Sequence, residues 1–290
     1  MESRQSVAPA PAPASPAARG LRPAWMWLTA AILVAAVNLA SVAWQPLTER
    51  NGGRGWDGIL YHFVTGQIAQ WLAAGSAFAL KGPSPFIERI GAPLLVALYS
   101  PDDVQRGFLH VNVIANLASA MLIFVLLLRH VRSPRWALGC FALYLLYWQG
   151  ATRNNYFEPI SVDSTTAFFI LTALLLLDSL WRAPRLWHLA ALSAVVSLGT
   201  LFHQTVAVLA LLGPVVCLTS PAAQRRDPGP RRRLLSASVL PLVAVAITWV
   251  AIARITSNVG NYSPVNTVLH WITEKSLSSY LHAWCIVFGP

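Results

Sequence analysis

Seven long apolar runs, separated by short connections, constrain the fold of this chain more than any other feature. They occupy residues 24–44, 107–128, 136–150, 160–181, 186–202, 204–219 and 234–254. A helix needs about 20 apolar residues to cross a bilayer, and most of these runs approach or reach that length. An eighth run begins near residue 277 and is cut off by the end of the chain. The sequence predicts an all-α, polytopic membrane helix bundle of about 7–8 transmembrane spans, truncated at its C-terminus.

The overall composition agrees with a membrane bundle. The chain is 56% hydrophobic and only 11% charged, whereas a soluble domain carries about 25% charged residues. Cys140, Cys217 and Cys285 all fall inside apolar stretches. They lack metal-ligand spacing, so we expect buried free thiols rather than a metal site.

The charges predict how the spans are oriented. If the spans alternate in direction, one side of the membrane carries 13 of the 21 basic residues and three acids, and the other carries eight of each. The whole excess of +10 therefore lies on the side that holds the N-terminus, which the positive-inside rule makes cytoplasmic. The excess of basic residues therefore reflects membrane topology rather than nucleic-acid binding. We expect no nucleic-acid partner. Nearly all the basic residues are Arg, which is typical of a GC-rich bacterium and suggests the inner membrane.

The chain divides into a tail and one membrane domain. Residues 1–23 are rich in Ala and Pro and predict a disordered cytoplasmic tail. Residues 24–290 form a single integral-membrane domain. Its first external loop, 45–106, contains two apolar segments, 57–74 and 86–99, that are too short or too interrupted to span easily. We expect them to be interfacial or re-entrant helices. The next external connection is expected at 151–159.

Asp57 opens the first of these two segments and has two interpretations. Asp is a favoured N-cap, and the preceding Gly55 fits a turn that enters a helix. Alternatively, a partly desolvated carboxylate beside a membrane bundle is placed to act as a general base. A cap would direct its carboxylate to the amides of residues 59 or 60. A base would direct it into a cavity shared with Glu158 or Asp163.

Other ionisable residues gather on the same external side. Glu88 and Arg89 precede an apolar run. Arg suits phosphate recognition, and a local surface ion pair with interfacial snorkelling is the equally open alternative. Arg153 and Glu158 precede the fourth span, and Asp163 lies in its first turns, where an unpaired charge is costly. His203 lies at a turn between apolar runs, where hydrogen-bonded packing is the commoner role of a histidine.

Two further features complete the set of polar candidates. Asn112, Asn116 and Ser119 recur at near four-residue spacing in the second span, and we expect them to face other helices. No zinc-protease, phosphate-loop or dinucleotide-binding motif occurs. A divalent metal stays open, with Asp102-Asp103 as the one adjacent acidic pair.

Several local strings resemble the membrane glycosyltransferases of the GT-C superfamily. "WDGILYHF" resembles the D-G-x-x-Y opening of their first external loop, and "ERIGAPLLVAL" resembles their R-x-x-x-P-L-L segment. "EPISVDSTTAFFILTALLLL" is similar to their acidic-Pro entry into a span. "LGTLFHQTVAVL" stands where many members carry a basic residue followed by Glu-Thr, with Gln204 in place of the acid. No Asp-x-Asp occurs, which leaves metal dependence open.

The resemblance implies a function and a set of roles. It implies sugar transfer from a polyprenyl-phosphate donor, with Asp57 as the catalytic base. Arg89 and Arg153 then become candidates for the lipid phosphate. The remaining substrate-binding candidates are Tyr61, Glu88, Glu158, Asp163 and His203. No cofactor beyond the lipid-linked sugar and membrane lipids is implied.

Two other classes of function remain. A lipid or small-solute transporter predicts polar groups through the middle of the bundle and paired internal repeats. A non-catalytic membrane partner predicts that Asp57 only caps a helix. The acids lie on one side and no repeat is visible, which favours the enzyme. The sequence does not indicate an oligomeric state.

Overall fold

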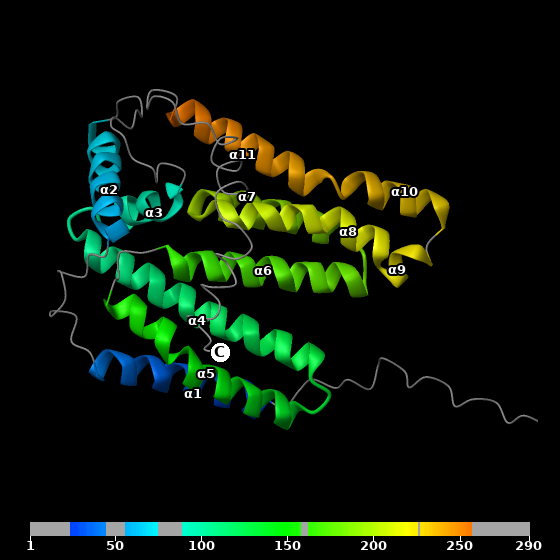
Figure 1. Cartoon of the computed structure of the whole chain (residues 1–290), viewed down its shortest axis with the longest axis horizontal. Helices are drawn as coiled ribbons and strands as arrows, with labels where there is room; N and C mark the ends of the chain where they lie inside the picture. Colours follow the sequence, from blue (N-terminus) through cyan, green and yellow to red (C-terminus); the bar gives the residue numbers. More distant parts are fainter. Residues whose placement is uncertain (1–23, 45–55, 75–88, 158–161, 226, 257–290) are drawn as a thin grey trace, which may run out of the picture.

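A computed structural model of the chain describes residues 24–44, 56–74, 89–157, 162–225 and 227–256 (Figure 1). All the regular elements in these residues are helices. They are α1 Ala24–Trp44, α2 Trp56–Ala74, α3 Gly91–Tyr99, α4 Val104–His130, α5 Pro134–Phe157, α6 Asp163–Arg182, α7 Leu186–Phe202, the 3₁₀ helix η4 Gln204–Leu211, α8 Leu212–Thr219, α9 Pro221–Gln224, α10 Pro228–Ala237 and α11 Leu240–Thr256. The tail 1–23 and the run after residue 277 lie outside the described residues.

Local chemistry accounts for several of the helix boundaries. The Asp103 carboxylate accepts a hydrogen bond from the Arg106 amide at 3.0 Å and caps α4, as short acidic side chains commonly do. α5 and α10 begin at Pro134 and Pro228, where a missing N–H costs nothing. α5 then runs on to Phe157, so most of the connection expected at 151–159 is helical.

Among the described residues, three helices are long and apolar enough to cross a membrane. They are Val104–His130, Asp163–Arg182 and Pro228–Ile252, the last of which passes from α10 into α11. Shorter apolar helices span Ala24–Ala40, Leu186–Phe202 and Gln204–Thr219. These long apolar helices indicate a membrane protein.

Most of the apolar surface of the long helices is not buried against other described residues. Only 39%, 28% and 22% of the most apolar stretches of the three candidate spans are buried. Large apolar side chains such as Ile114, Leu174 and Ile247 point outward. Several hydroxyl groups on these helices bond their own backbone, as when Thr172 Oγ1 donates to the Phe168 carbonyl at 2.8 Å. Apolar sides without open polar groups are what a hydrocarbon solvent requires.

The helices pack in two groups that meet at the α4–α6 contact. α1, α4 and α5 share one apolar core, which includes Phe124 and Phe141. α6, α7, η4 and α11 share another, which includes Leu192 and Val196. The chain reverses at His203, because Val206 after the turn lies against Gly199 before it.

η4 is an unusually long 3₁₀ segment, and Pro214 affects the hydrogen bonding at its C-terminal end. Proline lacks the N–H that would bond the Ala210 carbonyl, and its ring crowds that carbonyl. The α-helical ladder is therefore interrupted there, and α-helix resumes only at Leu212.

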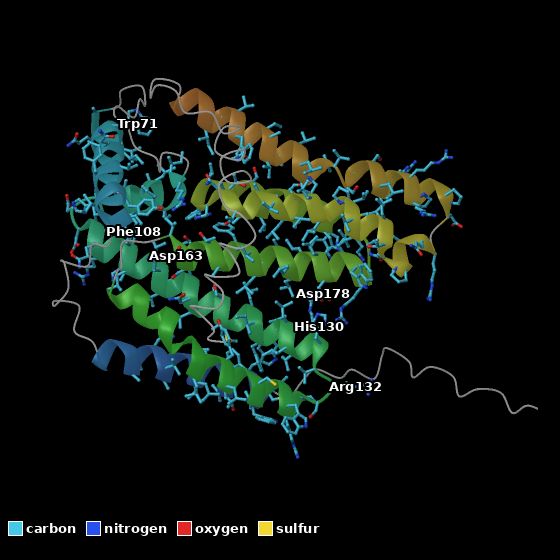
Figure 2. All side chains as sticks on the ribbon, in the orientation of Figure 1. Trp71, Phe108, His130, Arg132, Asp163 and Asp178 are labelled. Atoms are coloured by element: carbon cyan, nitrogen blue, oxygen red, sulfur yellow. The ribbon has the colours of Figure 1, made fainter. Side chains whose placement is uncertain are left out.

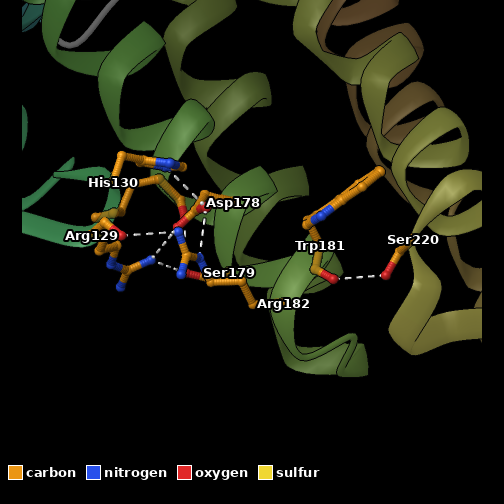
Figure 3. Close-up of polar contacts among 8 residues, drawn as sticks. Arg129, His130, Asp178, Ser179, Trp181, Arg182 and Ser220 are labelled. Carbon is orange, nitrogen blue, oxygen red and sulfur yellow. Dashed lines mark hydrogen bonds and ion pairs between the residues drawn. The ribbon is translucent and has the colours of Figure 1, made fainter. Parts of the chain in front are cut away.

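One end of the bundle collects arginine-bearing connections, and we call it the arginine-rich end. Its centre is Asp178, which accepts hydrogen bonds from Arg129 Nη1 at 3.0 Å and Arg182 Nε at 2.9 Å (Figure 3). His130 Nε2 lies 3.2 Å from the same carboxylate. These contacts join the C-terminal ends of α4 and α6. Figure 2 shows Asp178, His130 and Arg132 at this end and Asp163 far from it.

The opposite end, which we call the α2 end, is built differently. α2 runs across the ends of the bundle helices rather than along them (Figure 1). It packs against α3 and more lightly against α4. A helix that crosses the bundle ends agrees with the expectation of interfacial segments in the first loop.

A pair of glycines tests the packing of the α7–η4 turn. A Cβ at Gly199 would lie 2.6 Å from Val206 Cγ1 and 2.9 Å from Phe169 Cβ, whereas a Cβ at Gly139 would meet nothing within 4 Å. We expect Gly199→Ala to lower the free energy of unfolding by about 1–2 kcal/mol through overpacking. Gly139→Ala should raise it by about 0.5–1 kcal/mol through helix propensity. Unfolding in mixed micelles measures both, and equal effects would contradict the packing.

Candidate anion site at the α2 end

Four of the predicted site residues come together at the α2 end. Tyr61 belongs to α2, Arg89 stands two residues before α3, Asp163 begins α6, and His203 follows α7. These residues belong to or border one apolar cluster. It consists of Tyr61, Ala92, Val96, Val104, Phe108 and Val162, with Phe202 packed against it. Segments far apart in the sequence thus share one small region.

Tyr61 and Arg89 are joined directly. The Tyr61 side chain is buried, with 1% of its surface exposed, and its ring packs on Phe108 with centroids 6.2 Å apart. Arg89 Nη1 donates a hydrogen bond to the Tyr61 hydroxyl at 3.0 Å. Because the ring is fixed by its packing, the hydroxyl holds the guanidinium in a defined place.

Gly91 allows α3 to approach the end of α7 closely. A Cβ at this position would lie 2.7 Å from Phe202 Cδ2. The contact brings Arg89 beside the turn that contains His203. The N-terminus of α3 also has no side-chain cap, since Ile90 occupies the cap position. A guanidinium next to an uncapped helix N-terminus is an arrangement that favours an anion.

His203 is a neutral hydrogen-bond donor in this arrangement. Its Nδ1 accepts from the Thr205 amide at 3.2 Å and lies 2.8 Å from Thr205 Oγ1. Burial, and secondly the positive charge of Arg89, lower the pKa of His203 to about 4. The imidazole is therefore uncharged near neutral pH, and its proton sits on Nε2, because Nδ1 is an acceptor.

Asp57 occupies the second position of α2, which begins at Trp56. Residues four apart on a helix lie on one face, so Asp57 stands one turn before Tyr61 on the same face. Only its backbone is described, so the choice between cap and base stays a prediction. The helix nevertheless places the backbone of Asp57 one turn from Tyr61, which bonds Arg89.

The remaining candidates divide by what the structure describes. Asp163 is exposed at the first turn of α6, next to the buried Val162 of the shared apolar cluster. Arg153 lies within the last turns of α5 rather than in a loop, with only its backbone described. Glu88 and Glu158 lie outside the described residues.

A buried polar stripe on α4 leads from this end into the bundle. Asn112, Asn116 and Ser119 are 0%, 3% and 0% exposed, as expected for polar residues that face other helices. Among the described residues, Asn116 Oδ1 and Ser119 Oγ have no hydrogen-bond partner. Such atoms are usually bound to water or to a ligand when buried.

The described residues offer no group of three His, Cys, Asp or Glu side chains that could hold a metal ion. Of the adjacent acidic pair, Asp103 is engaged as the cap of α4. Thr205, which holds the His203 ring, was missed in the sequence analysis. A Thr two residues after a histidine at a turn is the signal that could have found it.

The site combines one fixed cation, a neutral N–H donor and acids at its edge. This set suits a singly charged phosphate ester with hydroxyl groups nearby. In comparisons with known proteins, no protein family, curated protein or solved structure matches the chain.

Tyr61→Phe tests whether the buried hydroxyl fixes Arg89. The ring packing stays and the acceptor is lost, so we expect the free energy of unfolding to fall by about 1.5–3 kcal/mol, as for a hydrogen bond to a charged group. Tyr99→Phe is the matched control, because the Tyr99 hydroxyl bonds His110 at an exposed position. It should cost under about 0.5 kcal/mol. Equal losses in thermal unfolding in detergent would contradict the fixed pair.

Proposed function

We propose that the chain is a GT-C-type membrane glycosyltransferase, which transfers a sugar from a lipid-phosphate carrier to an acceptor at the extracytoplasmic face. The observation that carries this proposal is the cluster at the α2 end. There, Arg89, neutral His203 and the Asp57 position meet where α2 crosses the bundle. The membrane is the bacterial inner membrane, crossed by 7–8 spans with the N-terminus in the cytoplasm, in line with the positive-inside rule.

The proposed reaction assigns a step to each group. The Asp57 carboxylate takes the proton of an acceptor hydroxyl, and the resulting oxygen attacks the anomeric carbon. The bond between that carbon and the phosphate oxygen breaks, and the electron pair leaves with the phosphate. Arg89 stabilises the growing negative charge on the phosphate, with the His203 Nε2–H as a second donor. Arg153 is the second candidate for phosphate.

The other acids bind sugar or acceptor hydroxyls in this proposal. Asp163 stands exposed at the edge of the cluster, and carboxylates are good acceptors for hydroxyl donors. Glu88 and Glu158 take the same role. A divalent metal is not needed for these steps and stays open.

A transporter of lipids or small solutes is the second candidate, and the α4 stripe favours it. Buried polar atoms without described partners, at Asn116 and Ser119, are what a solute path through the bundle would need. A transporter predicts that Asn116→Leu abolishes transport. The enzyme predicts that the same variant, when folded, still transfers sugar.

Asp57→Asn in the full-length protein tests the general base. The amide cannot accept the proton, so we expect transfer of the lipid-linked sugar to fall about 10²–10⁴-fold. The control is Asp102→Asn, an exposed aspartate outside the proposed machinery, which should retain wild-type transfer. The measurements are glycan products and the lipid-linked donor, which should accumulate with Asp57→Asn. Normal glycan products at normal expression would show that Asp57 is not the general base.

A further inference from the structure

The exposed tryptophans of the described residues all lie at the arginine-rich end. Five of the described tryptophan side chains are exposed, from 38% at Trp27 to 73% at Trp136. Trp25 and Trp27 begin α1, Trp136 begins α5, Trp181 ends α6 and Trp187 begins α7. Trp27 also packs edge-on against Phe124 in the C-terminal half of α4, which places the start of α1 at this end.

This arrangement defines one level along the bundle. Indole rings have an apolar body and one N–H donor, and they concentrate where hydrocarbon meets water. The neighbouring helix sides are apolar and exposed, for example Leu28 and Leu143. The tryptophans therefore mark the boundary of the bilayer on this side.

Arginines without carboxylate partners stand at the same level. Arg129 and Arg182 are held by Asp178. By contrast, the described residues provide no ion pair for the arginines of the α4–α5 and α6–α7 connections or of α10. These are Arg132, Arg135, Arg185, Arg231, Arg232 and Arg233. Asp227, the other described acid near them, is exposed and makes no capping hydrogen bond.

We propose that this belt of tryptophan and arginine binds the headgroups of anionic phospholipids. A guanidinium matches a phosphate diester with paired donors, and the indole beside it packs on the first part of the acyl chain. The uncompensated positive charge selects lipids with a net negative charge over zwitterionic ones. Each arginine at such a surface strengthens the preference roughly fivefold. Free phosphate satisfies only the arginines and leaves the indoles and apolar sides uncovered.

The proposal does not depend on the proposed enzyme activity, because the belt and the candidate site lie at opposite ends. It adds a function for the Asp178 cluster. By holding Arg129 and Arg182, Asp178 joins α4 and α6 and keeps the two arginine-bearing connections side by side. Removing Asp178 should weaken the fold and leave the lipid preference at least as strong, because Arg129 and Arg182 lose their carboxylate partner.

Tryptophan quenching by brominated lipids measures the preference directly. The full chain is reconstituted in phosphatidylcholine vesicles, and phosphatidylglycerol or phosphatidylcholine brominated close to the headgroup is titrated in. We expect the anionic quencher to act at lower mole fraction than the zwitterionic one. The triple variant Arg132→Gln, Arg135→Gln and Arg185→Gln should reduce this difference roughly fivefold for each arginine removed. Raised salt should reduce the difference in the wild type.

Two controls and one competitor make the result decisive. Arg106→Gln removes one exposed arginine at the α2 end and should leave the difference unchanged. Asp178→Asn should lower the midpoint of thermal unfolding and retain or enlarge the difference, because it frees Arg129 and Arg182. Inorganic phosphate at millimolar concentration should not compete. Equal quenching by both lipids in the wild type, an unchanged triple variant, or full competition by phosphate would each overturn the proposal.

Discussion

The structure depends on where the apolar sides of its long helices can be placed. The described protein covers less than half of each candidate span, and an uncovered apolar helix is stable only in hydrocarbon. This constraint pushes charge away from the middle of the bundle and toward its ends. Uncharged polar groups remain in the middle where they face other helices, as Asn112 and Asn116 do on α4.

The two ends use charge in different ways. At the arginine-rich end many cations share a single well-paired carboxylate, Asp178, so positive charge remains for the surroundings. At the α2 end the positive charge of Arg89 is held by a neutral phenol and stands near a neutral histidine. The first arrangement suits a broad negative surface such as a lipid leaflet. The second suits one anion in one place.

The sequence predicted the helical class and the positions of most helices, because apolar periodicity is a local property. Of the candidate site residues that it singled out, Tyr61, Arg89, Asp163 and His203 lie at one end of the bundle, and their role as a site stays a prediction. It failed where polarity was taken to end a helix. α5 continues through Arg153, Asn154 and Asn155, because a helix that leaves the hydrocarbon keeps its backbone hydrogen bonds in water.

The contacts inside the site were beyond sequence reasoning for a different reason. The Tyr61–Arg89 hydrogen bond joins residues 28 apart, and it exists only because α2 crosses the bundle and Gly91 lets α3 touch Phe202. From side-chain polarity alone, an ion pair and a phosphate were equally good predictions for the partner of Arg89. The partner found in the structure is the neutral hydroxyl of Tyr61, which neither interpretation had included.

The fixed position of the Arg89 guanidinium suits anion binding in a site with so few described cations. A free arginine loses rotamer entropy when it grips an anion, and this loss weakens binding. At Arg89 this rotamer entropy is lost during folding rather than on binding, because the hydroxyl of the packed Tyr61 ring already holds the guanidinium. The neutral state of His203 adds a donor without drawing a second anion. A site built this way favours one phosphate ester over a cluster of negative charges.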